Sequence, residues 1–293
     1  MGLIVAPSAP VIAGISANAG ITKKSNVKKV VVNKTRENTK SAFIEAPASA
    51  TRKLICIAHR GASGHEPENT LRAIRRALEF GADGIEIDVY FVDGELVVFH
   101  DAKLDRTTNG RGRLMKKKFE QLRALDAGKG ERIPTLREVL DTVDGRAFIN
   151  IELKGRRTAK PVMELIRGQM RERGLRREDF LISSFWRREL RDLRALGGSE
   201  IPLGILFARR ARRFKKLAAQ LGASAIHTPL NFTSARLVRR AHENNLKVFV
   251  YTANDPRDVE RMRKIGVDGV FTDFPERVNS RAANDATNAN LRA

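Results

Sequence analysis

The chain has 293 residues, of which 42% are hydrophobic and 30% are charged, so it is long enough for one large α/β domain or two small ones. No apolar run approaches ~18 residues, which argues against a membrane-spanning helix, and the single cysteine, Cys56, excludes an intrachain disulfide. The formal net charge of +21 favours attraction to anions such as phosphates, nucleic acids or anionic lipid head groups.

The positive charge is spread along the chain. Residues 1–53 contain nine basic and two acidic residues, a net charge of +7, and the remainder carries +14. Much of this excess is arginine on predicted helices, where such residues usually form a solvated face. Because no aromatic platform or nucleic-acid-binding motif accompanies the charge, we expect no nucleic-acid partner. The sequence is compatible with peripheral attraction to an anionic membrane surface, and it does not indicate the oligomeric state.

The first 50 residues are rich in Ala, Ser, Pro, Asn and Lys and show little periodicity. We expect a mostly disordered extension over 1–50, with a cleaved export or organelle signal as the alternative. The stretch Ala17-Asn18-Ala19 resembles a signal-peptidase site, but no positive charge precedes the weak apolar region and two prolines interrupt it. The expected location is therefore cytoplasmic. A flexible tail is expected over 281–293.

From Leu54 onward, short apolar runs alternate with amphipathic stretches, which is typical of strands alternating with helices. The predicted strands cover 54–58, 84–90, 96–100, 147–153, 180–185, 201–207, 224–228, 246–252 and 268–272. The predicted helices cover 69–80, 135–143, 159–173, 187–196, 211–221, 233–244 and 256–265. If 96–100 pairs with 84–90 as a hairpin, eight parallel strands remain. The sequence therefore predicts a (β/α)8 TIM barrel over 51–280, with a small insertion, 101–145, after the second strand. An open doubly wound sheet is the alternative.

Chemically active side chains fall at the predicted strand ends, where the active sites of such barrels lie. These candidates are His59, Arg60, Glu86, Asp88, His100, Glu152, Lys154, Phe185 and Tyr251. Residues two apart on a strand point to the same face, so Glu86 and Asp88 share a face, as do Glu152 and Lys154.

Three carboxylates converging on one mouth suit a hard divalent cation, Ca2+ or Mg2+, with oxygen ligands. Zinc would prefer histidine or cysteine. Arg60 and Lys154 supply donors that match a phosphate. The two histidines, His59 and His100, are available as a proton donor and acceptor.

The motifs HRG, PENT, GADGIEIDV, VVFHD, LDRTTNG, IELK, YTAND and GVDGVFTDFP follow one another over about residues 54–279. This series closely resembles the glycerophosphodiester phosphodiesterase family. The joint occurrence of HRG, E-x-D, HD and E-x-K in this order is strongly specific. The resemblance implies a TIM barrel that cleaves glycerophosphodiesters, as small-molecule substrates, into an alcohol and glycerol 3-phosphate. It also implies a divalent metal, Ca2+ or Mg2+, with Mn2+ possible.

The resemblance also implies a role for each candidate. His59 and His100 match the acid–base pair, and Arg60 and Lys154 match residues that act on the phosphate. The metal ligands correspond to Glu86, Asp88 and Glu152. Glu68, in the PENT turn, is expected to lie next to the metal or to support its ligands, and Asn69 and Thr70 to cap the following helix. Phe185 and Tyr251 match positions that shape the glycerol pocket, where the family usually has tryptophan instead of Tyr251.

The expected mechanism passes through a cyclic glycerol phosphate, with His59 as the base and His100 as the acid. One alternative is a related barrel enzyme, like a phospholipase D or C, acting on lysophospholipids or other phosphodiester lipids; Phe185, Trp186 and Phe232 would form its apolar rim. Another alternative is a basic binding protein on an inactive barrel. It predicts the loss of a histidine or a metal carboxylate, and none is lost.

Overall fold

The computed structural model describes residues 53–279, so the predicted extension over 1–50 and the tail over 281–293 lie outside the described residues. Eight parallel strands form a closed barrel in which β1 pairs with β2 on one side and with β9 on the other. These strands are β1 (Ile55–His59), β2 (Gly84–Val92), β4 (Phe148–Leu153), β5 (Phe180–Ser184), β6 (Leu203–Leu206), β7 (Ala225–Pro229), β8 (Lys247–Tyr251) and β9 (Gly269–Thr272). The closure confirms the predicted TIM barrel and excludes the open doubly wound sheet.

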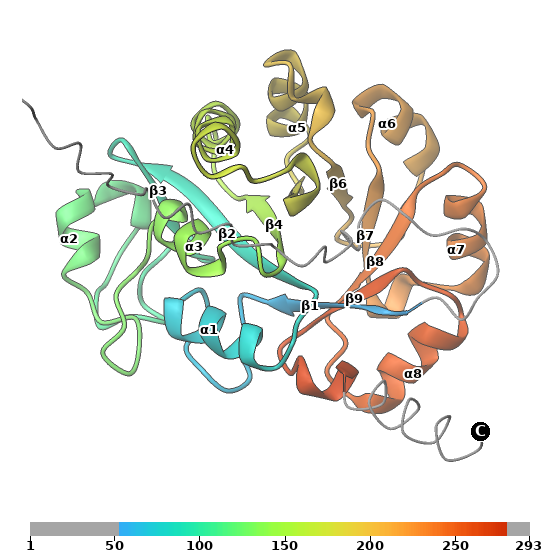
Figure 1. Cartoon of the computed structure of the whole chain (residues 1–293), viewed down its shortest axis with the longest axis horizontal. Helices are drawn as coiled ribbons and strands as arrows, with labels where there is room; N and C mark the ends of the chain where they lie inside the picture. The colour runs from blue at the N-terminus through green and yellow to red at the C-terminus, as the bar shows by residue number, and fades with distance from the viewer. Residues whose placement is uncertain (1–52, 280–293) are drawn as a thin grey trace, which may run out of the picture. The chain divides into compact units, whose positions relative to one another are not determined.

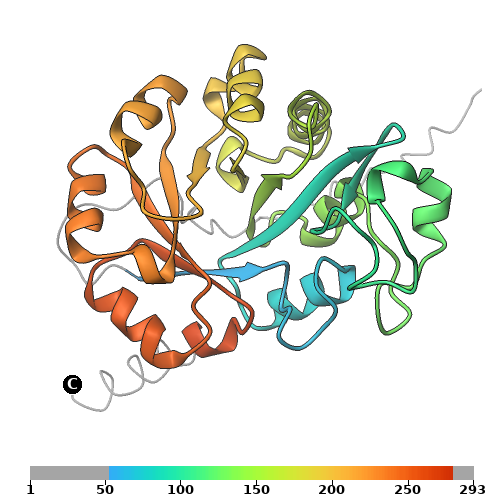
Figure 2. The same cartoon turned by 180° about the vertical axis from the view of Figure 1, so that it is seen from behind.

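Helices surround the strands of the barrel (Figures 1 and 2). They are α1 (Leu71–Glu79), α3 (Leu136–Val143), α4 (Ala159–Arg173), α5 (Arg187–Ala195), α6 (Phe214–Leu221), α7 (Ala235–His242) and α8 (Pro256–Lys264). Short 3-10 turns lie in three of the connections between helices and strands: η2 (Arg177–Asp179), η3 (Gly198–Glu200) and η4 (Leu230–Phe232). Among the described helices, none combines the length and hydrophobicity that a membrane crossing requires.

The insertion after the second strand has a small core of its own. Strand β3 (Glu95–Val98) returns antiparallel to β2, and the chain then forms η1 (Leu114–Lys116) and α2 (Phe119–Arg123) at one side of the barrel (Figures 1 and 2). The buried side chains of this region pack together: Tyr90, Val92, Val97, Phe99, Leu104, Leu114, Leu122, Ala127 and Ile133. Those of α3 belong to the main core instead, so α3 is a helix of the barrel.

Local residue choices set where the helices begin and end. The Thr70 side chain accepts a hydrogen bond from the Ala73 N–H and caps α1, as expected of a threonine at this position. The prediction for α6 begins three residues too early, because Arg213 adopts a left-handed backbone (φ 54°) that no helix can include. Gly222, which the structure places at the C-cap of α6, has a φ of 57°.

The interior of the barrel is apolar at its base and polar at the carboxyl ends of the strands. The apolar cluster comprises Ile55, Ile57, Phe148, Leu181, Ala225, Phe249 and Phe271. Above it lies His227, which is fully buried against the rings of Phe249 and Phe271, with centroids 5.6 and 5.0 Å away. Burial lowers the pKa of His227 to about 3, so its imidazole is neutral at physiological pH.

Gly204 on β6 leaves the space that the His227 ring occupies. A Cβ at position 204 would lie 2.4 Å from His227 Nε2, and the ring is held between two phenylalanines. We expect Gly204→Ala to lower the free energy of unfolding by about 1–3 kcal/mol through overpacking. In a His227→Ala background the same change should cost less than ~1 kcal/mol, because the obstructing ring is gone.

Urea denaturation of the four proteins in this cycle measures the coupling. Gly168→Ala is the matched control, since a Cβ there meets nothing closer than 3.7 Å and alanine favours a helix. Equal costs of Gly204→Ala in both backgrounds would show that His227 is not what the glycine accommodates.

Candidate active site

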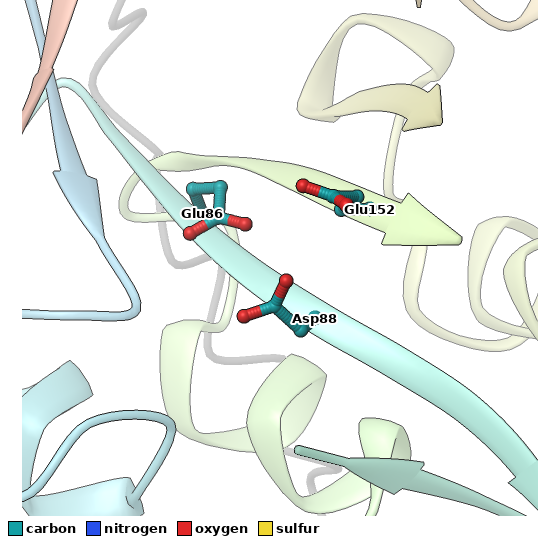
Figure 3. A group of neighbouring side chains, drawn as sticks. All are labelled: Glu86, Asp88 and Glu152. Carbon is teal, nitrogen blue, oxygen red and sulfur yellow. The ribbon is translucent and has the colours of Figure 1, made fainter. Parts of the chain in front are cut away.

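Three carboxylates from two neighbouring strands form an acidic cluster. Glu86 and Asp88 lie on β2, and Glu152 lies on β4 directly opposite Asp88. One carboxylate oxygen of each lies within 4.8 Å of the others, and all three residues are buried. Figure 3 shows the side chains directed toward one another from the two strands. The structure thus brings together the three residues that the sequence indicated as metal ligands.

The cluster is short of positive charge. Burial raises the pKa of Glu86 well above its ordinary value, and the charges of Asp88 and Glu152 add to this effect. Burial, with Asp88 next, raises the pKa of Glu152 to about 7. Lys154 Nζ lies 3.0 Å from Glu152 Oε1 and 3.4 Å from Asp88 Oδ1, yet it does not offset the repulsion. Three buried oxygen donors that carry more negative charge than Lys154 and Arg60 offset fit a hard divalent cation.

Asn69 fixes the orientation of Asp88. The Asn69 amide donates from Nδ2 to Asp88 Oδ2 at 2.9 Å, and its Oδ1 accepts from the Asp88 N–H at 3.3 Å. The sequence predicted that Asn69 and Thr70 would both cap the following helix. That prediction is correct for Thr70 and wrong for Asn69, because Asp88 offers the amide two partners at once, a carboxylate oxygen and a backbone N–H.

Arg60 lies between the acidic cluster and Glu68. A left-handed backbone at Arg60 (φ 58°) directs its N–H to Glu86 Oε2 at 2.9 Å. The guanidinium donates from Nη1 to Glu68 Oε1 at 2.7 Å, and Nε lies 3.5 Å from Asp88 Oδ2. Glu68 also accepts two hydrogen bonds of 2.7 Å from Arg106. Glu68 therefore contacts arginines and lies outside the carboxylate cluster, where it holds the Arg60 side chain.

His59, at the end of β1, pairs with an aspartate from the other end of the chain. Its Nδ1 lies 2.7 Å from Asp273 Oδ1, immediately after β9. Asp273 also accepts from Ser63 Oγ at 2.9 Å and from Asn254 Nδ2 at 2.6 Å. Burial raises the pKa of Asp273, but the hydrogen bond from His59 and those from its other partners outweigh burial and hold the pKa at about 2. Asp273 is thus ionised and fixes His59 through Nδ1.

His100 forms a second pair of the same kind with its neighbour in sequence. Its Nδ1 lies 2.5 Å from Asp101 Oδ1, and Arg106 donates to both oxygens of Asp101 at 2.7 and 3.1 Å. The Arg106 hydrogen bond is the main reason that the pKa of Asp101 falls to about 2. Burial lowers the pKa of His100, and Lys154 and Arg60 act in the same direction against the charge of Asp88.

A cavity of about 190 Å³ opens between the two histidines at the carboxyl ends of the strands. All of the predicted site residues line it except Asp88 and Glu68, and its walls include His59, Arg60, Glu86, His100, Glu152, Lys154, Phe185 and Tyr251. Phe185 and Tyr251 meet edge to face, with centroids 6.2 Å apart. The Tyr251 hydroxyl donates to the Phe207 carbonyl at 2.7 Å. Its ring therefore forms a fixed aromatic wall in the place where the resemblance expects tryptophan.

Comparisons with known proteins agree with this geometry. The profile of the glycerophosphoryl diester phosphodiesterase family matches residues 59–277. A glycerophosphodiester phosphodiesterase of Caldanaerobacter subterraneus subsp. tengcongensis is 40% identical over 236 residues, covering 76% of this chain and 96% of the relative. A glycerophosphodiester phosphodiesterase of Bacillus subtilis is 30% identical over 270 residues, covering 80% and 91%.

Solved structures show the same similarity. An Oleispira antarctica phosphodiesterase in complex with the product sn-glycerol-3-phosphate superposes with a TM-score of 0.71 at 30% identity, over 77% of this chain and 95% of that one. A glycerophosphodiester phosphodiesterase of Agrobacterium tumefaciens gives a TM-score of 0.68 at 30% identity, over 78% and 99%.

Fold and site together define a TIM-barrel hydrolase with an acidic cluster suited to a metal ion. The chain belongs to the glycerophosphoryl diester phosphodiesterase family, whose members hydrolyse phosphoric diesters. The family resemblance seen in the sequence is therefore confirmed.

Four residues that shape the site were not among the sequence candidates: Asn69, Asp101, Arg106 and Asp273. Asp101 and Asp273 each carried a signal, since both stand next to a strand end within the motifs HD and TDFP. The pairing of Asp273 with His59 spans 214 positions and follows only from barrel closure. Arg106 lies in the basic stretch after β3, which from sequence alone is typical of a solvated loop.

Neighbouring residues Asn69 and Thr70 allow a matched test of the support for Asp88. We expect Asn69→Ala to weaken the apparent metal affinity by about 10–100-fold, because a ligand carboxylate loses its orienting partner. Thr70→Ala should lower the free energy of unfolding by about 1 kcal/mol, through loss of the helix cap, and leave the metal affinity unchanged. Titration of activity against Mg2+ and Ca2+ measures the difference. Equal metal affinities for the two variants would contradict the role of Asn69.

Proposed function

We propose that this chain hydrolyses glycerophosphodiesters to an alcohol and glycerol 3-phosphate by acid–base catalysis with His59 and His100. The observation that carries the proposal is the pair of His–Asp contacts on one small cavity, next to a carboxylate cluster and two cations. The product bound to the Oleispira antarctica relative supports the same substrate class.

Each histidine is bound through Nδ1 to an aspartate, which leaves Nε2 for the substrate. In the first step, the glycerol hydroxyl next to the phosphate loses its proton to one histidine and attacks phosphorus. The other histidine protonates the departing alcohol, and a cyclic glycerol phosphate forms. Water then opens the ring, with the two histidines exchanging roles, so that both recover their starting protonation.

We assign the base of the first step to His100 and the acid to His59, the reverse of the assignment made from the sequence. Asp101 accepts two hydrogen bonds from the Arg106 cation, which partly neutralises its charge. Asp273 has only neutral partners besides His59. Asp273 therefore presents the less neutralised negative charge to its histidine, which suits the residue assigned as the acid. The lowered pKa of His100 favours its neutral, proton-accepting form at physiological pH.

Glu86, Asp88 and Glu152 are the residues that would hold a divalent cation, Ca2+ or Mg2+, with Mn2+ as a further candidate. Such an ion would act as a Lewis acid, lowering the pKa of a bound hydroxyl and neutralising charge on the phosphate. Arg60 and Lys154 line the same cavity and stabilise the charge that develops on the phosphoryl oxygens. The aromatic pair of Phe185 and Tyr251 excludes water on the other side and contacts the glycerol carbons.

Removal of either histidine tests the catalytic assignment. His59→Ala and His100→Ala should each lower kcat for glycerophosphocholine by about 10²–10⁴-fold, while circular dichroism shows unchanged folding. His242→Ala serves as the control, because His242 lies on α7 and contacts Asp268 instead of the cavity. Activity within tenfold of the unchanged protein in either catalytic variant would refute the assignment.

The dependence of kcat/KM on pH separates the two roles. The acidic limb should lie below about pH 6.5, the ordinary histidine value, because the free enzyme must hold its base, His100, unprotonated. The hydrogen bond to Asp101 raises the pKa of His100, so Asp101→Asn should move this limb to still lower pH. Asp273→Asn should lower activity without moving the limb. If Asp273→Asn moves it and Asp101→Asn does not, His59 is the base.

A lysophospholipid is a second candidate substrate. Phe185, Trp186 and Phe232 are 40%, 49% and 40% exposed, on loops that follow strands β5 and β7. An apolar rim of this kind is what a substrate with an acyl chain would require. Parallel assays of lysophosphatidylcholine and glycerophosphocholine compare the two classes through kcat/KM.

A further inference from the structure

A groove of about 830 Å³ lies between the N-terminal parts of helices α6 and α7. The loop after β6 and the loop after β7 form its walls. Its lining contains seven basic residues and no acidic residue: the basic ones are Arg210, Arg212, Arg213, Lys215, Lys216, Arg236 and Arg240. This groove is separate from the catalytic cavity, with which it shares no lining residue.

The seven cations have no internal counter-charge. All are exposed, and within residues 53–279 none forms an ion pair with a carboxylate. The arginines of α8 show the contrast, because Arg257, Arg261 and Arg263 each lie within 3.6 Å of an Asp or Glu oxygen. Seven like charges around one groove create a positive potential that attracts anions.

Helix stability does not explain this arrangement. Lys215 and Lys216 lie in the first turn of α6 and Arg236 in the first turn of α7, and neither first turn contains an acidic residue. Cations at the N-terminus of a helix oppose its dipole and lower its stability. The residues therefore carry a cost to the fold that an external anion would offset.

Exposed aromatic side chains lie on the same face as the groove. Phe232 is 40% exposed and lines the groove itself. Phe185 and Trp186, on the loop after β5, are 40% and 49% exposed. In a (β/α)8 barrel the loops that follow the strands all lie at the catalytic end. Cations and aromatic rings thus occupy the end of the barrel at which the active-site cavity opens.

We propose that this face docks on an anionic phospholipid bilayer, with the groove binding lipid phosphates and Phe232 and Trp186 entering the head-group region. An inorganic polyanion would use the cations but gives no reason for apolar rings exposed beside them. Single-stranded RNA would stack a base on Phe232, but it gives no reason for Trp186, which is exposed on the same face and does not line the groove. An anionic bilayer binds both features, because clustered basic residues attract anionic lipids and aromatic rings partition into the interface. Docking would turn the catalytic mouth toward the membrane surface.

Co-sedimentation of the full chain with vesicles tests the proposal. The vesicles are phosphatidylcholine alone, or phosphatidylcholine with one third phosphatidylglycerol, at physiological ionic strength. The groove variant is Arg212→Gln with Arg236→Gln. The control variant is Arg171→Gln with Lys264→Gln, which removes the same charge near the C-terminal ends of α4 and α8, away from the mouth.

We expect the unchanged chain to bind the anionic vesicles and not the neutral ones. The groove variant should bind about 30-fold more weakly, since each cation at an anionic surface contributes a factor of about five. The control variant should bind as the unchanged chain does, and both should retain activity on glycerophosphocholine. Equal weakening in both variants, or none in either, would overturn the proposal, because the attraction would then follow from net charge or another segment.

Phe232→Ala distinguishes a bilayer from a soluble polyanion. Salt screens the attraction between the cations and the lipids but does not weaken the insertion of the aromatic ring. Without the Phe232 ring, binding depends on the cations alone, so we expect this variant to release from anionic vesicles at a lower salt concentration than the unchanged chain. Binding to single-stranded RNA, measured in parallel, should be weaker than vesicle binding. Tight RNA binding that depends on Arg212 and Arg236, combined with vesicle binding that is indifferent to Phe232→Ala, would contradict the bilayer and assign the groove to a polyanion.

Discussion

Three carboxylates buried within 4.8 Å of one another repel, and the rest of the catalytic end is arranged around that repulsion. Arg60 and Lys154 lie against the cluster, and Asn69 holds Asp88 by two hydrogen bonds. Such an arrangement is costly without a cation, because burial and the neighbouring carboxylates raise the pKa values of Glu86 and Glu152. The same features support the proposal that a hard divalent ion binds here next to a phosphate.

Barrel closure brings this cluster together with the other residues of the candidate active site. Strands β2 and β4 bring the carboxylates together, β1 contributes His59 and Arg60, and the loop after β9 contributes Asp273. The insertion, which has its own small core, supplies Arg106 and holds Asp101 and Glu68. The two histidines therefore have different surroundings, one next to an aspartate with neutral partners and one next to an aspartate shared with arginine.

Much of this was predictable from sequence, for identifiable reasons. The strand and helix pattern follows from side-chain periodicity. Glu86 and Asp88 share one face of β2, and Glu152 lies on the neighbouring strand β4 near its end, so their convergence follows from the barrel. Contacts that form only in the folded chain could not be predicted from the sequence. Asp273 contacts His59 across 214 positions, and Asn69 donates a hydrogen bond to the buried Asp88 carboxylate instead of capping a helix. The late start of α6 depends on one left-handed residue, Arg213, which no periodicity reveals.

The central claim is that the carboxylate cluster binds the divalent cation on which hydrolysis depends. Calorimetric titration of EDTA-treated protein with Mg2+, Ca2+ and Mn2+, with glycerophosphocholine hydrolysis assayed on the same samples, tests it most directly. We predict one bound ion per chain, recovery of activity in proportion to occupancy, and loss of both in Glu152→Gln. Full activity in EDTA, or metal binding that survives replacement of Glu152 with affinity unchanged, would contradict the account.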